Sequence, residues 1–222
     1  MDKNLKMDIL KYFDKVYCIN MDKRPDRWEQ AQIEFKKLGI ENDVIRWSGV
    51  ENEDGNLGCT LSHLSIIKHC RKNNFKKVLI FEDDVLFVEN DTNKLKEAFD
   101  ELFQMGNWDL FYIGSTVDPN VGRFNRVTNN ILRTNFAYAT HAYAVNSQAF
   151  DLMINAWENT IKTGHNIVDT TLCQQIVSRG KSFVMDPIYA IQQPGFSDIG
   201  KGDVESYEWM VDFFNKIKSQ MT

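Results

Sequence analysis

The 222-residue sequence has little of what marks several protein classes. Its four prolines and twelve glycines exclude a low-complexity or collagen-like chain. No apolar run approaches the ~20 residues that a membrane-spanning helix needs, and the first twelve residues lack the apolar core of a signal peptide. Basic residues are outnumbered, since 26 Lys and Arg stand against 31 Asp and Glu, a net charge of −5. We therefore expect a soluble, cytoplasmic protein that does not hold nucleic acid through bulk electrostatics.

The four cysteines also lack the spacing of a metal or disulfide framework. They are Cys18, Cys59, Cys70 and Cys173, and none belongs to a C-x-x-C pair. Each lies in or beside an apolar run. This pattern favours buried free thiols in a reducing compartment over a zinc site or disulfide bonds.

Strands and helices alternate along the first half of the sequence. Short apolar runs predict strands at 15–21, 43–47, 77–81 and 109–113. Apolar residues at helical spacing predict helices at 25–38, at 60–72 with Thr60 as the cap, and around 95–103. Such alternation favours right-handed βαβ units and an α/β fold with a mostly parallel sheet. Ligands of such sheets bind beyond the carboxyl ends of the strands.

The second half is less regular. Residues 115–134 have no periodicity, which predicts a long loop, and loops of this length in compact domains are usually functional or mobile. Further elements are predicted as a strand at 136–145, helices at 147–157 and 169–178, and a strand at 183–185. No linker divides the chain. We expect one domain over residues 1–222, with a core at about 14–200 and a C-terminal helix at about 204–218.

The segment VLIFEDDVLFV at 78–88 places three carboxylates, Glu82, Asp83 and Asp84, between two apolar runs. A poorly solvated carboxylate is destabilising by several kcal/mol unless a cation or hydrogen-bond donors compensate it. One interpretation is that the strand ends here and the acids cap the next turn. We favour a site for Mg²⁺ or Mn²⁺, because these ions prefer oxygen ligands and would also join carboxylates to a phosphate-bearing ligand.

Six segments in order resemble glycosyltransferase family 25, which contains lipooligosaccharide sugar transferases and procollagen galactosyltransferase catalytic domains. They are VYCINMDKRPDRW (16–28), WSGV (47–50), LGCTLSHLSII (57–67), FEDDV (81–85), WDLFYIG (108–114) and THAYAVN (140–146). The likeness runs from about residue 14 to residue 200. It implies a GT-A fold with a Rossmann-like central sheet, a UDP-sugar donor and usually Mn²⁺. The expected reaction transfers a hexose, galactose or glucose, to a hydroxyl of a glycan or glycoprotein acceptor.

The resemblance also implies roles for individual residues. Asp84 would coordinate the metal directly, with Glu82 beside it, and Glu82 and Asp83 would hold the ribose, a metal-bound water or the donor sugar. The remaining donor contacts would be a uridine pocket of Ile19, Asn20, Met21 and Val50, with Arg24, Arg27, Ser62 and His63 near the ribose and phosphates. From the residues alone, two arginines at a helix start read as surface charge and a lone histidine as a core residue.

Two regions toward the C-terminus complete the expected site. Asp169 and Asp83 are the candidate catalytic carboxylates, Asp169 as a general base or acceptor-binding residue, although it could equally cap a helix. The segment IQQPGFSDIGKG at 191–202 resembles a block that covers the nucleotide, but it lacks the histidine of the procollagen members. Gln193 or Ser197 would then contact the diphosphate, unless the segment is an ordinary glycine-rich loop.

Two alternatives belong to other classes. KKVLIFEDDVLF resembles the start of a Mg²⁺-binding receiver domain of a signalling protein. However, 76 residues precede Lys77, and residues 119–150 contain no aspartate where a receiver would carry its phosphorylated one. The second alternative is an inactive nucleotide-sugar-binding module on the same scaffold, because a fold does not dictate activity.

Overall fold

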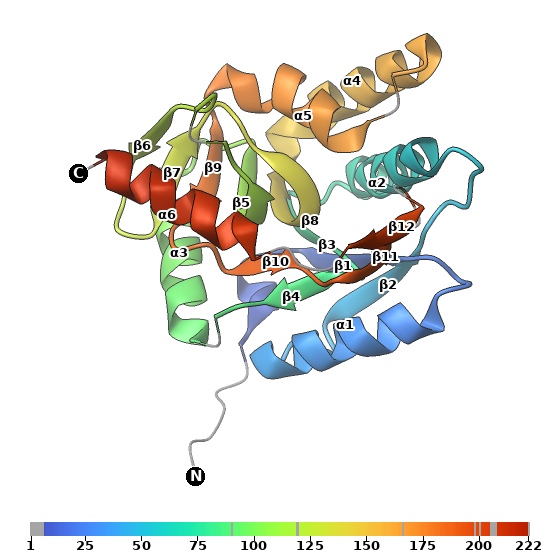
Figure 1. The fold of residues 1–222 in the computed structure, drawn as a ribbon, viewed down its shortest axis with the longest axis horizontal. Coiled ribbons are helices and arrows are strands. Elements are labelled where there is room, and N and C mark those ends of the chain that lie inside the picture. The colour runs from blue at the N-terminus through green and yellow to red at the C-terminus, as the bar shows by residue number, and fades with distance from the viewer. Residues whose placement is uncertain are drawn as a thin grey trace.

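A computed structural model describes residues 7–89, 91–118, 120–165, 167–197, 199, 201–204 and 208–221. Its centre is an eight-stranded sheet in the order β2-β1-β3-β8-β5-β9-β7-β6 (Figure 1). The strands are β1 (Lys15–Asn20), β2 (Val44–Ser48), β3 (Lys77–Glu82), β5 (Leu110–Thr116), β6 (Phe124–Arg126), β7 (Ile131–Thr134), β8 (Tyr138–Asn146) and β9 (Ser182–Met185). Strands β8 and β7 run opposite to the others. The predicted α/β fold with a mostly parallel sheet is confirmed.

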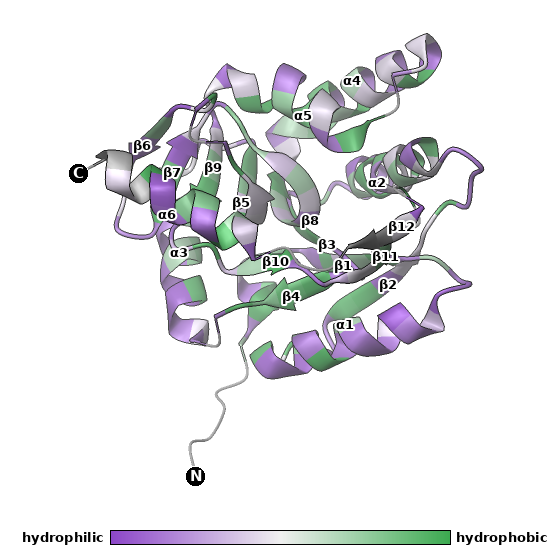
Figure 2. Cartoon of the chain, in the orientation of Figure 1, coloured by the Kyte–Doolittle hydropathy of each residue, from purple (hydrophilic) through white to green (hydrophobic). Residues whose placement is uncertain are grey.

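Helices cover both faces of the sheet. They are α1 (Pro25–Leu38), α2 (Gly55–Lys72), α3 (Thr92–Met105), α4 (Phe150–Thr163), α5 (Val168–Gln175) and α6 (Trp209–Met221), with short 3₁₀ turns at Ile9–Lys11, Ser147–Ala149 and Val177–Arg179. One apolar core joins α2, α4, α5 and α6 to one face, and a second joins α1 and α3 to the other. Side chains of β3 alternate between the two cores, as expected for a strand that is buried on both faces. Figure 2 shows hydrophobic residues concentrated in the central strands.

Local signals set both ends of α1. Pro25 occupies the first turn, where its missing N–H is not needed, and Gly39 ends the helix with a left-handed φ of 69°. Helix α2 differs from its prediction, because Asp54 and not Thr60 is the cap: the Asp54 carboxylate accepts the N–H groups of Asn56 and Leu57. The helix therefore begins five residues before Thr60.

The glycine-rich first turn of α2 packs closely on the preceding loop. A Cβ at Gly58 would lie 2.7 Å from the carbonyl oxygen of Val50. Glycine is a weak helix former, which hides this turn from the helical pattern, but its missing side chain allows the close approach.

The prediction of a long loop at 115–134 is largely wrong. Strand β5 extends to Thr116, and β6 and β7 form an antiparallel pair at the edge of the sheet. Both strands are short, and β6 is mostly exposed, so neither has the continuous apolar run by which a buried strand is recognised. Pro119 lies outside the described residues.

Two small antiparallel sheets complete the molecule. Strand β4 (Val85–Phe87) pairs with β10 (Ala190–Gln192), and β11 (Gly195–Ser197) pairs with β12 (Gly202–Val204). The first pair brings the segment around residue 190 against the residues that follow β3. The last predicted helix is confirmed as α6, with Met210, Phe214 and Ile217 buried. Among the described residues, no helix has the length and apolar character needed to cross a membrane.

Candidate active site

The three consecutive acids form a turn at the carboxyl end of β3. Glu82 is the last residue of β3, and Asp83 and Asp84 precede β4. The turn is held from two sides. The buried carboxylate of Glu34 in α1 accepts the N–H of Phe87 at 3.1 Å, and the N–H of Gln193 donates to the carbonyl of Asp84 at 2.6 Å.

A cavity of about 330 Å³ opens in front of this turn. Most of the residues predicted to bind the donor or a metal line it: Ile19, Met21, Arg27, Val50, Ser62, His63, Glu82, Asp83, Asp84, Gln193 and Ser197. The structure thus gathers residues from β1, α1, α2, β3 and the segment after β10 around one space. Asn20, Arg24 and Asp169 do not line it.

Asp84 has the least satisfied carboxylate of the turn. Its Oδ2 accepts a hydrogen bond from the Nε2 of Gln192 at 3.0 Å, whereas its Oδ1 is buried without a hydrogen-bond partner among the described residues. Burial, with the negative charge of Glu82 as the next cause, raises the pKa of Asp84 from 3.8 to about 7. The charge of Arg27 only partly offsets these effects, and one carboxylate oxygen has no partner among the described residues, so the residues present fit a divalent cation.

Asp83 is engaged by donors on both carboxylate oxygens. Asn20 donates to Oδ2 at 2.7 Å, and Arg27 donates to Oδ1 at 3.1 Å. Burial raises the pKa of Asp83, and these two partners oppose the increase. Arg27 also donates to the carbonyl of Phe196 at 3.0 Å. Asp83 therefore fixes Arg27, which in turn ties the acidic turn to β11.

Two residues that were predicted to contact the sugar donor, Asn20 and Arg24, do not line the cavity. Ile19 and Met21 face the cavity, and the side chain of Asn20, between them in β1, points away, as strand alternation requires. The Asn20 amide donates to Asp83 and to the carbonyl of Arg24, and its oxygen accepts from Arg46 at 2.7 Å. Arg24 pairs with Asp26 at 2.9 Å, at the start of α1. Its side chain is 20% exposed and is not part of the cavity lining.

Ser62 supports the loop that carries Val50. Its hydroxyl accepts the N–H of Val50 at 2.8 Å and donates to the carbonyl of Gly58 at 2.7 Å. The hydroxyl thus both accepts and donates a hydrogen bond within the protein. Ser62 shapes the wall of the cavity that Val50 forms.

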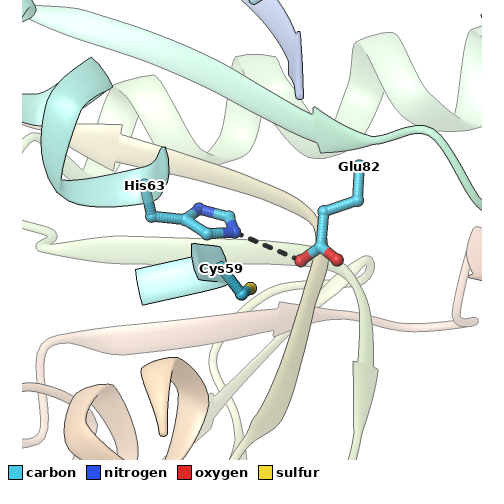
Figure 3. A group of neighbouring side chains, drawn as sticks. All are labelled: Cys59, His63 and Glu82. Atoms are coloured by element: carbon cyan, nitrogen blue, oxygen red, sulfur yellow. Dashed lines mark hydrogen bonds and ion pairs between the residues drawn. The ribbon is translucent and has the colours of Figure 1, made fainter. Parts of the chain in front are cut away.

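His63 is fully buried and links α2 to β3 and β8. Its Nδ1 lies 2.9 Å from the hydroxyl of Tyr143, and its Nε2 lies 3.3 Å from Oε1 of Glu82, which also accepts from Thr140 at 2.6 Å. Burial alone would raise the pKa of Glu82, but the hydrogen bond and charge of His63 and the bond from Thr140 hold it below its ordinary value. Figure 3 shows Cys59 and His63 projecting from α2 toward Glu82.

Asp169 lies in the first turn of α5 and is not among the residues that line the cavity. Its carboxylate accepts the N–H of Thr170 at 2.6 Å and that of Ala139 at 3.1 Å. Ala139 has a left-handed φ of 65°, a conformation that a non-glycine residue rarely adopts. The charge of Asp169 contributes to the raised pKa of Cys59, after burial and Glu82, which places it within electrostatic reach of the site.

Comparison with known proteins agrees with this geometry. The model of glycosyltransferase family 25 (LPS biosynthesis protein) matches residues 48–171, more than half of the chain, including α2 and the acidic turn. The chain belongs to glycosyltransferase family 25. The family resemblance in the sequence is confirmed, and membership replaces the receiver-domain alternative.

Relatives in glycosyltransferase family 25 include proteins named as inactive and as active. Inactive glycosyltransferase 25 family member 3 of Homo sapiens is 27% identical over 161 residues, which cover 60% of this chain and 27% of the relative. Procollagen galactosyltransferase 2 of Mus musculus is 24% identical over 175 residues, which cover 65% of this chain and 28% of the relative. The chain thus spans about a quarter of the length of these relatives.

A solved structure supports the GT-A fold expected for glycosyltransferase family 25. A glycosyltransferase involved in the glycosylation of the major capsid of PBCV-1 superposes with a TM-score of 0.54 at 14% sequence identity. The match covers 78% of this chain and 81% of that one. The GT-A type of fold is confirmed.

Several residues of this family 25 site were not predicted from the sequence. They are Cys59, Thr140, Tyr143 and Gln192. The segments that carry them were noted, but their contacts are non-local. Cys59 differs from the expected buried thiols, because it is half-buried and lines the cavity, while Cys18, Cys70 and Cys173 are buried and free.

Proposed function

We propose that this chain is a metal-dependent glycosyltransferase that transfers a hexose, galactose or glucose, from a UDP-sugar to a hydroxyl of a glycan or glycoprotein. The observation that carries the proposal is the turn of three acids that lines a cavity of about 330 Å³, in which Oδ1 of Asp84 has no hydrogen-bond partner among the described residues. This oxygen is available to a cation.

Mn²⁺, or Mg²⁺, is the proposed cofactor. Asp84 would hold it, with Glu82 as the second candidate ligand and the amide of Gln192 close by. Oxygen donors suit these hard cations. When bound, the ion would act as a Lewis acid toward the diphosphate and so assist departure of UDP.

The cavity wall has an apolar part and a few basic side chains that suit the two ends of a UDP-sugar, and it also carries five acids: Glu51, Glu53, Glu82, Asp83 and Asp84. Ile19, Met21 and Val50 supply the apolar surface proposed to face the uracil. Arg27, Lys23 and Lys201 also line the cavity and would attract the diphosphate. The Arg27 guanidinium is held at 3.1 Å from Asp83 and 3.0 Å from the Phe196 carbonyl, so its position is fixed before the donor binds.

Gln193 and Ser197 are proposed to contact the diphosphate from the covering segment. Both line the cavity, and the Nε2 of Gln193 donates to the carbonyl of Val85 at 3.1 Å. Asp83 is proposed to keep Arg27 oriented during the reaction. Its predicted catalytic role would act through that arginine.

Asp169 remains the proposed proton acceptor or acceptor-binding residue. In an inverting displacement, the acceptor hydroxyl must lose its proton to a base. The carboxylate is half-buried, and its two backbone donors would orient it. Lipooligosaccharide, hydroxylysine of a collagen-like chain and other glycans are all candidate acceptors.

An inactive nucleotide-sugar-binding module is the second candidate, because some relatives are named inactive. A panel of UDP-sugars, incubated with the chain with and without Mn²⁺, separates the two. We expect Mn²⁺-dependent release of UDP from UDP-galactose or UDP-glucose, and no release by Asp84→Ala. Donor binding without turnover on any acceptor would instead identify a binding module.

A further inference from the structure

We infer that Cys59, His63 and Glu82 form a second cation site, for a thiophilic divalent ion of the Zn²⁺ class, beside the position at Asp84. One sulfur, one imidazole nitrogen and one carboxylate oxygen lie within 4.8 Å of one another (Figure 3). All three residues line the cavity, so an ion can enter from it. This site goes beyond the proposed transfer reaction, and it shares with the proposed Mn²⁺ position only Glu82, the second candidate ligand there.

The fold brings the three ligands together from two elements. Cys59 and His63 are four residues apart in α2, so both project from the same face of the helix. Glu82 reaches them from the end of β3. The Nε2 of His63 and the Oε1 of Glu82 are 3.3 Å apart. Two ligands on one tetrahedral zinc, each bonded at about 2.0–2.1 Å, lie about 3.4 Å apart. The His63–Glu82 pair thus has the spacing of two zinc ligands, a spacing that their hydrogen bond also gives, and Sγ of Cys59 lies within 4.8 Å of both.

Hydrogen bonds behind the ligands orient them as in known metal sites. Metal-bound histidines usually bond a second group through the other ring nitrogen, and metal-bound carboxylates are themselves hydrogen-bonded. Here the Nδ1 of His63 lies 2.9 Å from the Tyr143 hydroxyl, and Thr140 donates to Glu82 at 2.6 Å. The Tyr143 hydroxyl can donate or accept, so the proton of His63 can reside on Nδ1 while Nε2 binds the ion.

The donor set determines the class of ion. A thiolate and an imidazole favour Zn²⁺ over Mg²⁺ and Mn²⁺, whereas the oxygen groups around Asp84 favour the harder ions. Binding would release the thiol proton of Cys59. Three protein ligands leave a fourth position for water or another ligand. Two neighbouring sites of different chemistry would then share one cavity.

The test is a titration of the complete, chelator-treated chain with Co²⁺ as a spectroscopic substitute. We expect a thiolate-to-cobalt absorption band that saturates at one equivalent and that Zn²⁺, but not Mn²⁺, removes. Cys59→Ser should abolish the band and weaken Zn²⁺ binding at least about tenfold. The matched control, Cys173→Ser, and the neighbouring-site variant, Asp84→Asn, should keep the band. A band that survives in Cys59→Ser, or that Mn²⁺ removes, would overturn the inference.

A second measurement needs no variant and therefore does not depend on the folding of Cys59→Ser. The native chain is alkylated with and without Zn²⁺, and each cysteine is quantified by mass spectrometry. We expect Zn²⁺ to slow modification of Cys59 at least about tenfold, since a metal-bound thiolate is a weaker and less accessible nucleophile. Equal modification of Cys59 in both samples would contradict the site, whatever the catalytic activity of the chain.

Discussion

At the scale of single residues, the ionised carboxylate of Asp84 destabilises the folded chain when no metal is bound. Its pKa is about 7 in the folded chain, against 3.8 as the ordinary value. At pH values between 3.8 and about 7, the folded chain binds more protons than the unfolded chain. The contribution to stability is therefore complete at low pH and is lost as the pH rises through about 7.

Asp84→Asn removes this titration and should change the pH profile of stability. In the presence of a chelator, we expect the difference in unfolding free energy between the variant and the wild type to grow by about 1–3 kcal/mol, in favour of the variant, as the pH rises from 5 to 8. Urea denaturation at several pH values measures the difference. Asp151→Asn, at an exposed acid of α4, should show no such gain. Parallel profiles for wild type and Asp84→Asn would refute the buried-charge explanation.

A comparison of substitutions at Arg27, which lines the cavity, and at Arg24, which does not, tests the proposed contact between Arg27 and the nucleotide. Arg27 uses two nitrogens for Asp83 and the Phe196 carbonyl, and lysine cannot make both bonds with one planar group. We expect Arg27→Lys to raise the dissociation constant for UDP with Mn²⁺ at least about tenfold, the loss typical of one charge-assisted hydrogen bond. Arg24→Lys, outside the cavity, should leave it within about twofold. Equal effects in titration calorimetry would contradict the proposed position of the donor beside Arg27.

At the scale of elements, β5 depends on close contact with its neighbours at Gly114. A Cβ there would lie 2.3 Å from the carbonyl oxygen of Ala190 and 2.3 Å from Nε2 of His141. We expect Gly114→Ala to lower the unfolding free energy by about 3 kcal/mol or more, because strands on both sides must shift. Ser115→Ala is the control. Its buried hydroxyl has no hydrogen-bond partner among the described residues, so the change should be neutral or stabilising.

The pair β11–β12 is the element best placed to cover a bound donor. Gly195, Phe196 and Ser197 line the cavity, and Phe196 is 47% exposed. We expect UDP with Mn²⁺ to slow hydrogen exchange in peptides that span 191–204. Peptides from 124–134 should not respond, because they belong to β6 and β7 in the main sheet. Protection confined to 124–134, or absent from both, would exclude β11–β12 as the cover.

How well each element could be predicted depended on whether its signals are local. The ends of α1 follow from Pro25 and Gly39 themselves, and the buried run of β3 is continuous. The start of α2 was missed because Gly55 and Gly58 are poor helix formers, and Gly58 serves a close contact with the Val50 loop that the sequence does not reveal. Strands β6 and β7 were missed because partners distant in the sequence, not their own composition, hold them in the sheet.

At the scale of the whole molecule, the sequence predicted many of the side chains that line one cavity but not the hydrogen bonds between them. The three acids were predicted to lie at the end of a strand and before a ligand space, and they do. The hydrogen bond from Gln192 to Asp84 could not be predicted from the two adjacent glutamines. It depends on the pairing of β10 with β4, which places the Gln192 amide beside Asp84. The single-domain boundaries and the cytoplasmic location stay predictions.

The overall charge of the molecule makes the cavity's own groups decisive. A net charge of −5 gives no general attraction for a nucleotide, so binding must come from local cations and a metal. Titration calorimetry with UDP, with and without Mn²⁺, measures this directly. We predict binding that requires Mn²⁺ in the wild type and is lost in Asp84→Ala. UDP that binds equally well without the metal, or not at all with it, would contradict metal-dependent donor binding at Asp84.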